Sequence, residues 1–292
     1  MSDDGRRAVS LIAFIGSVFS PWYRWAGRRD PDNHVCINVV TYGPGGRWTM
    51  TERGRDDLSV TRDRFQVGPS ALEWRDGQLI ATVDELTTPI PGRLRGEIRV
   101  IPSAVTEIEA LLDPSGHHVW RPFAPLARIE VDLDRPGWRW SGHGYFDANF
   151  GASALEDDFK YWSWARFPHG EGAVTFYDAL RRDGGSEALA LRFDPAGRAA
   201  PMTPPPKARL PRSLWAVKRE TRSDVGFRPR QALQMLEAPF YNRAAVTTRI
   251  EGEEVTGVYE ALDCDRFASP LIKPMLALRV PRIRARRRQP RS

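Results

Sequence analysis

The sequence predicts an all-β protein with two antiparallel β units, each a barrel or a sandwich, and few short helices. Short apolar or alternating runs recur along the chain, turns rich in glycine and proline separate them, and helical periodicity is scarce. A length of 292 residues favours two such units over one. A hydrophobic content of 41% is enough for a packed core and too high for a disordered chain.

The first strands are expected close to the N-terminus. The apolar run LIAFIGSVF (11–19) is shorter than the roughly 20 residues that span a bilayer, so we expect a buried strand there. HVCINVVTYG (34–43) and the segment after its glycine-rich turn predict a hairpin. In ALEWRDGQLIATVDEL (71–86), Asp76-Gly77 lies between two extended runs, which is a strong hairpin signal.

The same pattern continues to the end of the sequence. Further strands, many of them in strand–turn–strand patterns, are predicted at 92–102, 127–134, 173–199, 214–223 and 244–262. Short helices are predicted only at TEIEALL (106–112) and ALEDDFKYW (154–162).

We expect one boundary near residue 155. It separates an N-terminal β domain (1–155) from a C-terminal β domain (156–281), with a basic tail at 282–292. The proline-rich stretch 201–211 is then a crossover within the second domain, or alternatively the boundary itself.

A faint internal similarity supports two related β units. WSGHGYFDANF (140–150) and VTGVYEALDCDRF (255–267) each carry a glycine, a strand and a tyrosine followed by an acid. The acid is Asp147 in the first segment, and the second segment offers Glu260 together with Asp263. We interpret the two segments as corresponding late strands.

Charge and cysteine content limit the function classes. The net charge is +6, and the six arginines of RIRARRRQPRS (282–292) account for all of it. Such a tail suits an anionic membrane surface, whereas the neutral body and the absence of a basic-aromatic motif argue against nucleic acid as a partner. Cys36 and Cys264 are too far apart in sequence to suggest a metal motif and fit a reducing cytoplasm.

The stretch SGHGYFDANFG (141–151) holds the candidate chemistry. Alternate strand residues share a face, which puts His143, Tyr145 and Asp147 together. Upstream, His118 and Trp120 share a face in the same way. If both faces line one cavity, they supply an acid, polar partners and an aromatic wall.

Three interpretations of these residues remain open at the level of spacing. Asp147 is an acid in a pocket, or it caps a loop while His118 is a satisfied core histidine, or His118, His143 and Asp147 bind zinc or iron. The sequence lacks a Gly-x-Ser-x-Gly nucleophile motif, a phosphate-binding loop and a His-Glu-x-x-His metal motif.

Four blocks in order give the chain a resemblance to a known family. They are FIGSVFSPWYRWAGRRDPDNHVCINVVTYGPGGRWTMTERGR (14–55), HHVWRPFAPLARIEV (117–131), GHGYFDANFG (142–151) and DFKYWSWARF (158–167). Together they resemble the carotenoid 1,2-hydratase (hydroxyneurosporene synthase) family over about residues 10–270. The resemblance implies a lipocalin-like fold and an enzyme without redox cofactor or metal that adds water to the terminal C1–C2 double bond of acyclic carotenoids such as neurosporene and lycopene.

The resemblance also assigns roles to residues. Asp147 and Tyr145 match the family's Gly-x-Gly-Tyr-x-Asp motif, and His118 and Trp120 match its His-x-Trp pair. We expect Asp147 to be the proton donor, Tyr145 to orient its proton, Trp120 to stabilise the cation and His118 to position the water and take up its proton.

Substrate contacts are expected from three further residues, His143, Trp162 and Trp164, although the two tryptophans also suit core packing. Because the implied substrate is apolar, we expect a cytoplasmic protein at the surface of the inner, photosynthetic membrane. We expect it to dock there through the basic tail and the aromatic residues of SPWYRW (20–25). A non-catalytic carrier of hydrophobic ligands and a related cyclase or pericyclase are the alternatives.

Overall fold

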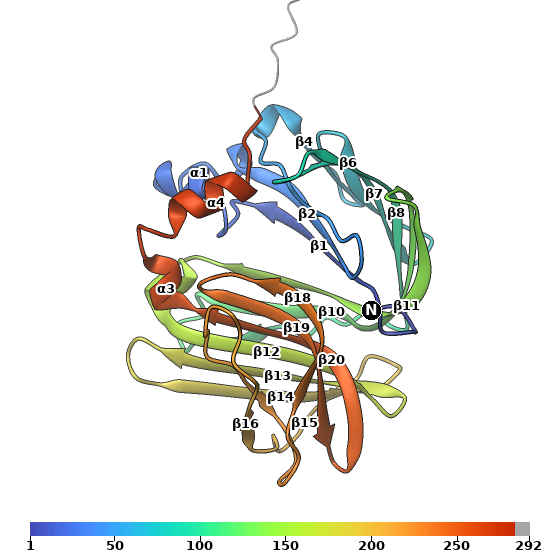
Figure 1. The fold of residues 1–292 in the computed structure, drawn as a ribbon, viewed down its shortest axis with the longest axis vertical. Helices are drawn as coiled ribbons and strands as arrows, with labels where there is room; N and C mark the ends of the chain where they lie inside the picture. The colour runs from blue at the N-terminus through green and yellow to red at the C-terminus, as the bar shows by residue number, and fades with distance from the viewer. Residues whose placement is uncertain (284–292) are drawn as a thin grey trace, which may run out of the picture. The chain divides into compact units, whose positions relative to one another are not determined.

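The computed structural model describes residues 1–283, which form two compact units (Figure 1). The first unit comprises Met1–Ile101, Ile129–Gly142 and the chain from Lys273 onward, and the second comprises Pro102–Arg128 and His143–Ile272. Two long, mutually paired strands, β10 (His118–Arg135) and β11 (Trp138–Gly151), contribute residues to both units. Because these strands run through both units, the observed division differs from the single boundary expected near residue 155.

Antiparallel strands dominate the first unit. Their order is β1-β2-β3-β7-β6-β5-β4, and β8 follows β7 as its antiparallel neighbour. The elements of this unit outside β10 and β11 are β1 (Ala8–Ile15), α1 (Pro21–Trp25), η1 (Pro31–Asn33), β2 (Val35–Tyr42), β3 (Trp48–Met50), η2 (Arg55–Asp57), β4 (Leu58–Val60), β5 (Arg64–Val67), β6 (Ser70–Arg75), β7 (Gln78–Thr87), β8 (Gly92–Pro102) and α4 (Lys273–Arg279).

Two sequence predictions for this unit concern the β6–β7 hairpin and the first strand. The β6–β7 hairpin turns at Asp76-Gly77, as predicted, and both residues have positive φ angles of 53° and 74°. That backbone suits the two-residue turn that matches the twist of paired strands. The apolar run at the N-terminus contributes residues 11–15 to β1 as predicted, and the strand ends before Gly16. The expectation of a buried strand was wrong, because most residues of β1 are only partly buried or exposed.

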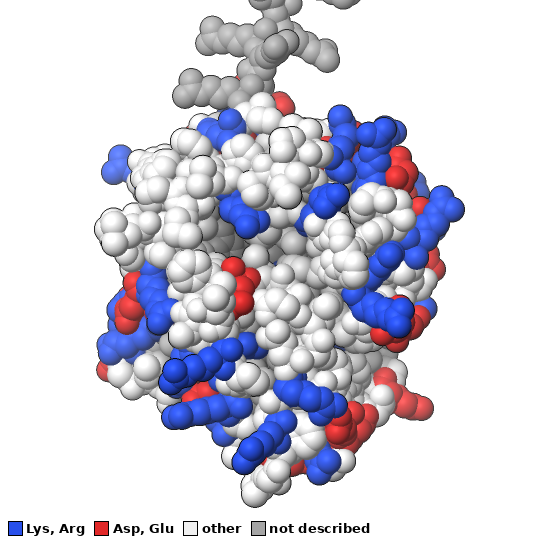
Figure 2. Space-filling model, in the orientation of Figure 1, with Lys and Arg blue, Asp and Glu red and all other residues white. Residues whose placement is uncertain are grey.

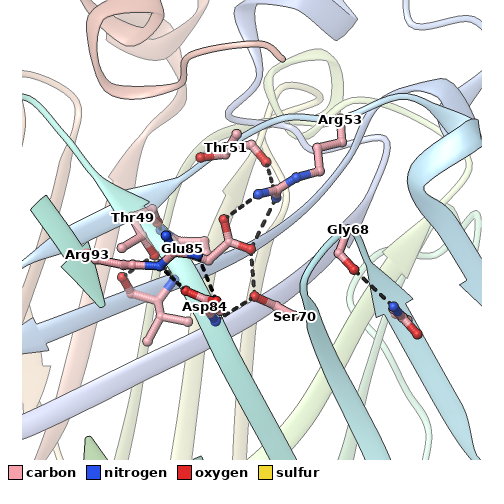
Figure 3. Close-up of polar contacts among 11 residues, drawn as sticks. Thr49, Thr51, Arg53, Gly68, Ser70, Asp84, Glu85 and Arg93 are labelled. Atoms are coloured by element: carbon pink, nitrogen blue, oxygen red, sulfur yellow. Dashed lines mark hydrogen bonds and ion pairs between the residues drawn. The ribbon is translucent and has the colours of Figure 1, made fainter. Parts of the chain in front are cut away.

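The interior of the first unit contains a buried ion pair (Figure 3). Arg53 donates two hydrogen bonds to the Glu85 carboxylate, from Nη1 to Oε1 at 3.1 Å and from Nη2 to Oε2 at 2.8 Å. The Ser70 hydroxyl adds a third at 2.7 Å. Burial raises the pKa of Glu85, and the hydrogen bonds and the charge of Arg53 oppose that rise.

The second unit is organised around a seven-stranded antiparallel sheet with the order β15-β14-β13-β12-β20-β19-β18. No pairing among the described residues joins β15 to β18, so this sheet is open rather than a closed barrel. The elements of the second unit outside β10 and β11 are β9 (Ala110–Leu111), α2 (Leu155–Asp158), β12 (Phe159–His169), β13 (Gly172–Arg181), β14 (Ser186–Phe193), β15 (Ala199–Pro201), β16 (Lys207–Arg209), β17 (Glu220–Arg222), β18 (Arg230–Glu237), β19 (Tyr241–Ile250), β20 (Glu253–Asp263) and α3 (Cys264–Ala268).

The two faces of this sheet differ in chemistry. One face carries the hydrophobic core, in which Ala165, Phe176 and Tyr259 pack together. Directly opposed residues on paired strands share a face. The neighbouring row of opposed residues therefore lies on the other face and brings two charged side chains to the middle of the sheet. This row consists of Tyr177, Trp164, Glu260 and Arg243.

Three local expectations were wrong. The predicted helix at 154–162 is helical only in α2, because the chain from Phe159 onward pairs with β13 and β20 as β12. The predicted helix at 106–112 is irregular except for β9, which pairs with β10. Of the segment 214–223, only Glu220–Arg222 is a strand, namely β17 paired with β16.

Across residues 1–283, none of the helices combines the length and the apolar character needed to cross a bilayer. The part of the basic tail beyond residue 283 lies outside the described residues.

Candidate active site

Asp147 and Trp120 meet in the second unit. The Trp120 indole Nε1 donates a hydrogen bond of 2.8 Å to Oδ2 of Asp147. Trp120 is almost completely buried on β10, and Asp147 is partly buried on β11. Pairing between these two strands brings together side chains that are 27 positions apart in sequence. The candidate acid and Trp120 are therefore in contact, and their catalytic roles stay predictions.

The environment of Asp147 favours its neutral form. Burial raises the pKa of this carboxyl from 3.8 to about 6, and the hydrogen bond from Trp120 opposes that rise. The carboxylate of Glu260 raises the pKa further, while the guanidinium of Arg243 lowers it. A carboxyl that gains its proton close to neutral pH is suited to general acid chemistry.

Tyr145 lies two residues before Asp147 and packs on the sheet of the second unit. Its ring is 5.0 Å from the ring of Trp164, at an interplanar angle of 45°. The Arg166 guanidinium carbon lies 6.0 Å from the centre of the same ring. Burial and the negative charges of Asp147 and Glu260 raise the pKa of the phenol, which is therefore neutral at physiological pH.

In the described chain, no hydrogen bond joins the Tyr145 hydroxyl to Asp147, whose side chain accepts from Trp120, so the orienting role of Tyr145 stays a prediction. Tyr145 contributes instead an aromatic face beside the acid, together with Trp164.

Arg166 brings a buried cation to this face. Its Nε donates to the backbone carbonyl of Pro125 at 3.0 Å. Burial lowers the pKa of Arg166 to about 10, so the guanidinium remains charged at neutral pH.

Glu260 is a second carboxylate of the site, and its role was missed in the sequence. Tyr241 donates to Oε2 of Glu260 at 2.7 Å, and Nε of Arg243 donates to Oε1 at 2.8 Å. Glu260 is opposite Trp164 on β12 and opposite Arg243 on β19. The similarity between 140–150 and 255–267 pairs Glu260 with Asp147 in sequence, and this was the one available signal.

His118 is engaged in a different group of residues. Its Nε2 lies 2.7 Å from Oδ2 of Asp158 and 3.2 Å from the Ser153 hydroxyl, and its ring packs on Phe159 at 4.8 Å. Partial burial works against ionisation of Asp158, but hydrogen bonds from Ser153 and His118 hold its pKa below the usual value. None of these contacts reaches Asp147, and the role of His118 toward water stays a prediction.

The remaining site residues lie on β11 and β12. Trp162 stacks on Tyr177 with ring centres 5.9 Å apart, and Trp164 contacts Tyr145. Within residues 1–283, the buried indole Nε1 atoms of Trp162 and Trp164 have no hydrogen-bond acceptor, which leaves two donors for a bound molecule or water. His143 is partly buried on β11, two residues before Tyr145.

The residues considered for a metal do not form a site. No cluster of three or more His, Cys, Asp or Glu side chains in the described chain could hold a metal ion. His118, His143 and Asp147 are therefore not brought together as ligands. The arrangement instead offers a carboxylic acid and a second, ion-paired carboxylate among aromatic rings.

Comparison with known proteins identifies relatives along nearly the whole chain. Residues 11–289 match the family described as carotenoid hydratase CrtC. The acyclic carotenoid 1,2-hydratase of Cereibacter sphaeroides is 56% identical over 273 residues, covering 93% of this chain and 98% of the relative. The enzyme of the same name from Rhodobacter capsulatus is 55% identical over 274 residues, covering 93% and 97%.

One solved structure supports the fold. A protein from Nitrosomonas europaea, described as a candidate AttH, superposes with a TM-score of 0.58 at 12% identity and covers 90% of this chain and 89% of its own. At that identity the similarity concerns the fold alone.

Proposed function

The chain belongs to the carotenoid hydratase family, and on that premise we propose that it adds water across the terminal C1–C2 double bond of an acyclic carotenoid. The family match and the relatives at 56% and 55% identity confirm the resemblance that the four sequence blocks indicated. Neurosporene and lycopene are the expected substrates. The observation that carries the proposal is the Asp147 carboxyl, which is held among aromatic side chains with a pKa raised by burial to about 6.

Protonation of carbon is the difficult step in this reaction. An isolated trisubstituted alkene is a weak base, so the acid has to be oriented and removed from bulk water. We propose that Asp147 gives its proton to C2, which moves the π electrons away from C1 and leaves a tertiary cation there. With a pKa near 6, about one tenth of the free protein carries this proton at pH 7. An apolar substrate that displaces water would raise that fraction.

The cation at C1 needs stabilisation until water adds. Aromatic faces attract cations by roughly 0.5–2 kcal/mol, and we propose the contacting rings of Tyr145 and Trp164 for this role. Trp120 presents its N–H edge to Asp147, so its role in stabilising the cation requires the substrate to lie over its ring face. The Glu260 carboxylate adds a negative potential that Arg243 partly offsets. Trp162 and His143 are proposed to line the path of the polyene.

Water then attacks C1 and forms the new C–O bond. The proton that the attacking water loses replaces the one that Asp147 gave to C2, so the acid is regenerated and no redox change occurs. The unpaired indole N–H groups of Trp162 and Trp164 are suitable donors to a water molecule at this point. We retain His118 as a candidate for orienting water through its bond to Asp158.

The substrate class bears on where the protein works. A long polyene resides in the bilayer, and no helix in residues 1–283 is suited to crossing one. We therefore propose that the protein works at a membrane surface on the cytoplasmic side, and that it takes one end of the carotenoid into the site.

An isotope experiment tests the reaction. Purified protein is incubated with lycopene or neurosporene in water enriched in ¹⁸O, and the product is analysed by mass spectrometry. Incorporation of one labelled oxygen per hydrated end supports the hydratase. Recovery of bound but unchanged carotenoid would identify a carrier, and an isomeric product without added oxygen would identify a cyclase or pericyclase.

A further inference from the structure

Two short helices of the first unit, α1 and α4, lie in contact, and both carry exposed apolar side chains. The contacts between α1 and α4 place residues 21–25 beside residues 273–279, although about 250 positions separate them in sequence (Figure 1). Trp22 joins the two, because its Nε1 donates to the backbone carbonyl of Val280 at 2.7 Å. Arg279 accepts a further bond of 2.9 Å from Trp48 through its backbone carbonyl. The inner side of this helix pair is thus tied to the core.

The outer side of the pair exposes large apolar side chains. Leu278 is 76% exposed, Trp25 is 56% exposed and Met275 is 44% exposed. Ile283, at the end of the described chain, is 42% exposed. Several exposed apolar side chains of this size on two adjacent short helices are typical of a surface that contacts a partner or a bilayer.

Basic residues surround these apolar side chains. Arg24 lies in the last turn of α1, Arg279 is the last residue of α4, and Arg29 is exposed shortly after α1. In the region of α1 and α4, Figure 2 shows a largely uncharged surface with basic groups at its margin. The acidic Asp30 is paired with Arg55, which reduces its effect on the local charge. Residues 284–292 follow directly after Ile283 and carry five arginines and no acid.

We propose that this α1–α4 surface docks the protein on an anionic lipid bilayer, with Trp25, Met275 and Leu278 entering the interface and the arginines facing lipid headgroups. Tryptophan is favoured at the level of the headgroups, and basic residues close to an anionic surface add attraction that salt screens. The inference rests on the proposed function for its biological purpose, because a bilayer is where a carotenoid is found. Its physical basis is the combination of exposed apolar and basic groups.

Vesicle binding tests this surface. The full chain is sedimented with vesicles of phosphatidylcholine alone and of phosphatidylcholine mixed with phosphatidylglycerol, at low and high salt. We expect binding to the mixed vesicles, weaker binding at high salt and little binding to phosphatidylcholine. Trp25→Ser with Leu278→Ser should weaken binding at least tenfold, given the apolar area withdrawn from the interface. Deleting residues 284–292 should weaken it by up to roughly fivefold for each arginine close to the headgroups.

A matched control is available in the second unit. Leu214 and Val225 are 85% and 91% exposed. Both belong to the second unit, whereas α1 and α4 belong to the first. Leu214→Ser with Val225→Ser should leave vesicle binding unchanged. Equal losses in both double variants, no binding of the parent to anionic vesicles, or a change of oligomeric state without loss of vesicle binding would each overturn the proposal.

Activity on detergent-solubilised carotenoid separates the two hypotheses. The Trp25 and Leu278 variant should keep that activity and its folded circular dichroism spectrum while losing vesicle binding. If no protein, parent or variant, hydrates the solubilised substrate while the parent still binds vesicles as described, the proposed function fails and the docking surface stands.

Discussion

Glu85 in the first unit and Asp147 in the second are both acids in the interior of a β structure, and their partners differ. Glu85 receives two hydrogen bonds from the Arg53 guanidinium and one from Ser70 (Figure 3). Asp147 receives one side-chain hydrogen bond, from the neutral indole of Trp120. A full-charge partner suits a permanently ionised carboxylate, whereas a neutral donor and a nearby second carboxylate suit a group that exchanges its proton.

We interpret this difference as one between an acid that stabilises the fold, Glu85, and the proposed catalytic acid, Asp147. Breaking the Arg53–Glu85 pair should affect stability, because an uncompensated buried charge remains. Removing the charge of Asp147 should affect chemistry, because its environment already disfavours the ionised form. Substitutions at the two positions are therefore expected to produce opposite patterns of effect.

The largest effect is expected for Asp147→Asn. The amide keeps an oxygen that can accept from Trp120 but has no acidic proton, so hydration should fall by about 100-fold to 10,000-fold, the range for loss of a general acid. The pKa of Asp147 is higher in the folded than in the unfolded chain, so the stabilisation by its neutral form is lost as pH rises from about 4 through about 6 and is absent at higher pH.

The variant should therefore unfold at pH 8 at a temperature no lower than that of the parent. Product formation and thermal unfolding measured on the same preparation check both expectations. Substantial turnover by a folded Asp147→Asn protein would remove Asp147 as the acid.

Arg53→Met should show the reverse pattern. Leaving Glu85 buried without its cation is expected to reduce the free energy of unfolding by about 3–5 kcal/mol, while each folded molecule keeps its hydratase activity. Urea titration with a parallel activity assay measures both effects. Arg93→Met is the matched control, because Arg93 pairs with Asp84 at the surface, where solvent screens the pair, and its loss should change stability far less than Arg53→Met does. Equal losses in the two variants would contradict the structural role given to Glu85.

Glu260→Gln should give the smallest effect, a change of pH dependence. Asp147 has to be protonated to act, so kcat/KM falls as pH rises through its pKa. The charged and titratable groups around it are Tyr145, Arg166, Arg243 and Glu260. Loss of the Glu260 charge also leaves Arg243 less neutralised, and both changes favour the Asp147 carboxylate.

The midpoint of the pH profile should therefore move to lower pH, by roughly 0.5–1 unit. Glu254→Gln provides the control, because Glu254 lies on the same strand, is exposed and pairs with Arg230. A midpoint that stays in place in Glu260→Gln, or that moves equally in Glu254→Gln, would show that Glu260 does not act on the acid.

The sequence singled out Asp147 as a candidate acid because strand alternation and the motif around it are local. Glu260 and Arg243 could not be assigned to the site in the same way, since their places depend on the registers of β12, β19 and β20. The β12–β20 register joins segments about 100 positions apart, and no local pattern specifies it. The β19–β20 hairpin is local and places Arg243 opposite Glu260, but only the pairing with β12 brings both residues to the site.

The incorrect helix predictions have a similar physical cause. Residues 154–162 have helical propensity only as far as α2, and beyond Phe159 pairing with two strands outweighs it. The all-β class was predictable because alternation and turn residues recur throughout the chain. The division into units was not, since β10 and β11 are continuous strands that serve both.

Direct titration of Asp147 tests the central claim. Protein labelled with ¹³C at the aspartate carboxyl carbon is followed by NMR across pH, with Asp147→Asn used to assign the resonance, and kcat/KM is measured over the same range. The account predicts a carboxyl midpoint near 6 that coincides with the pH at which kcat/KM falls by half. A midpoint close to the ordinary aspartate value of about 3.9, or a rate that does not follow the titration, would contradict it.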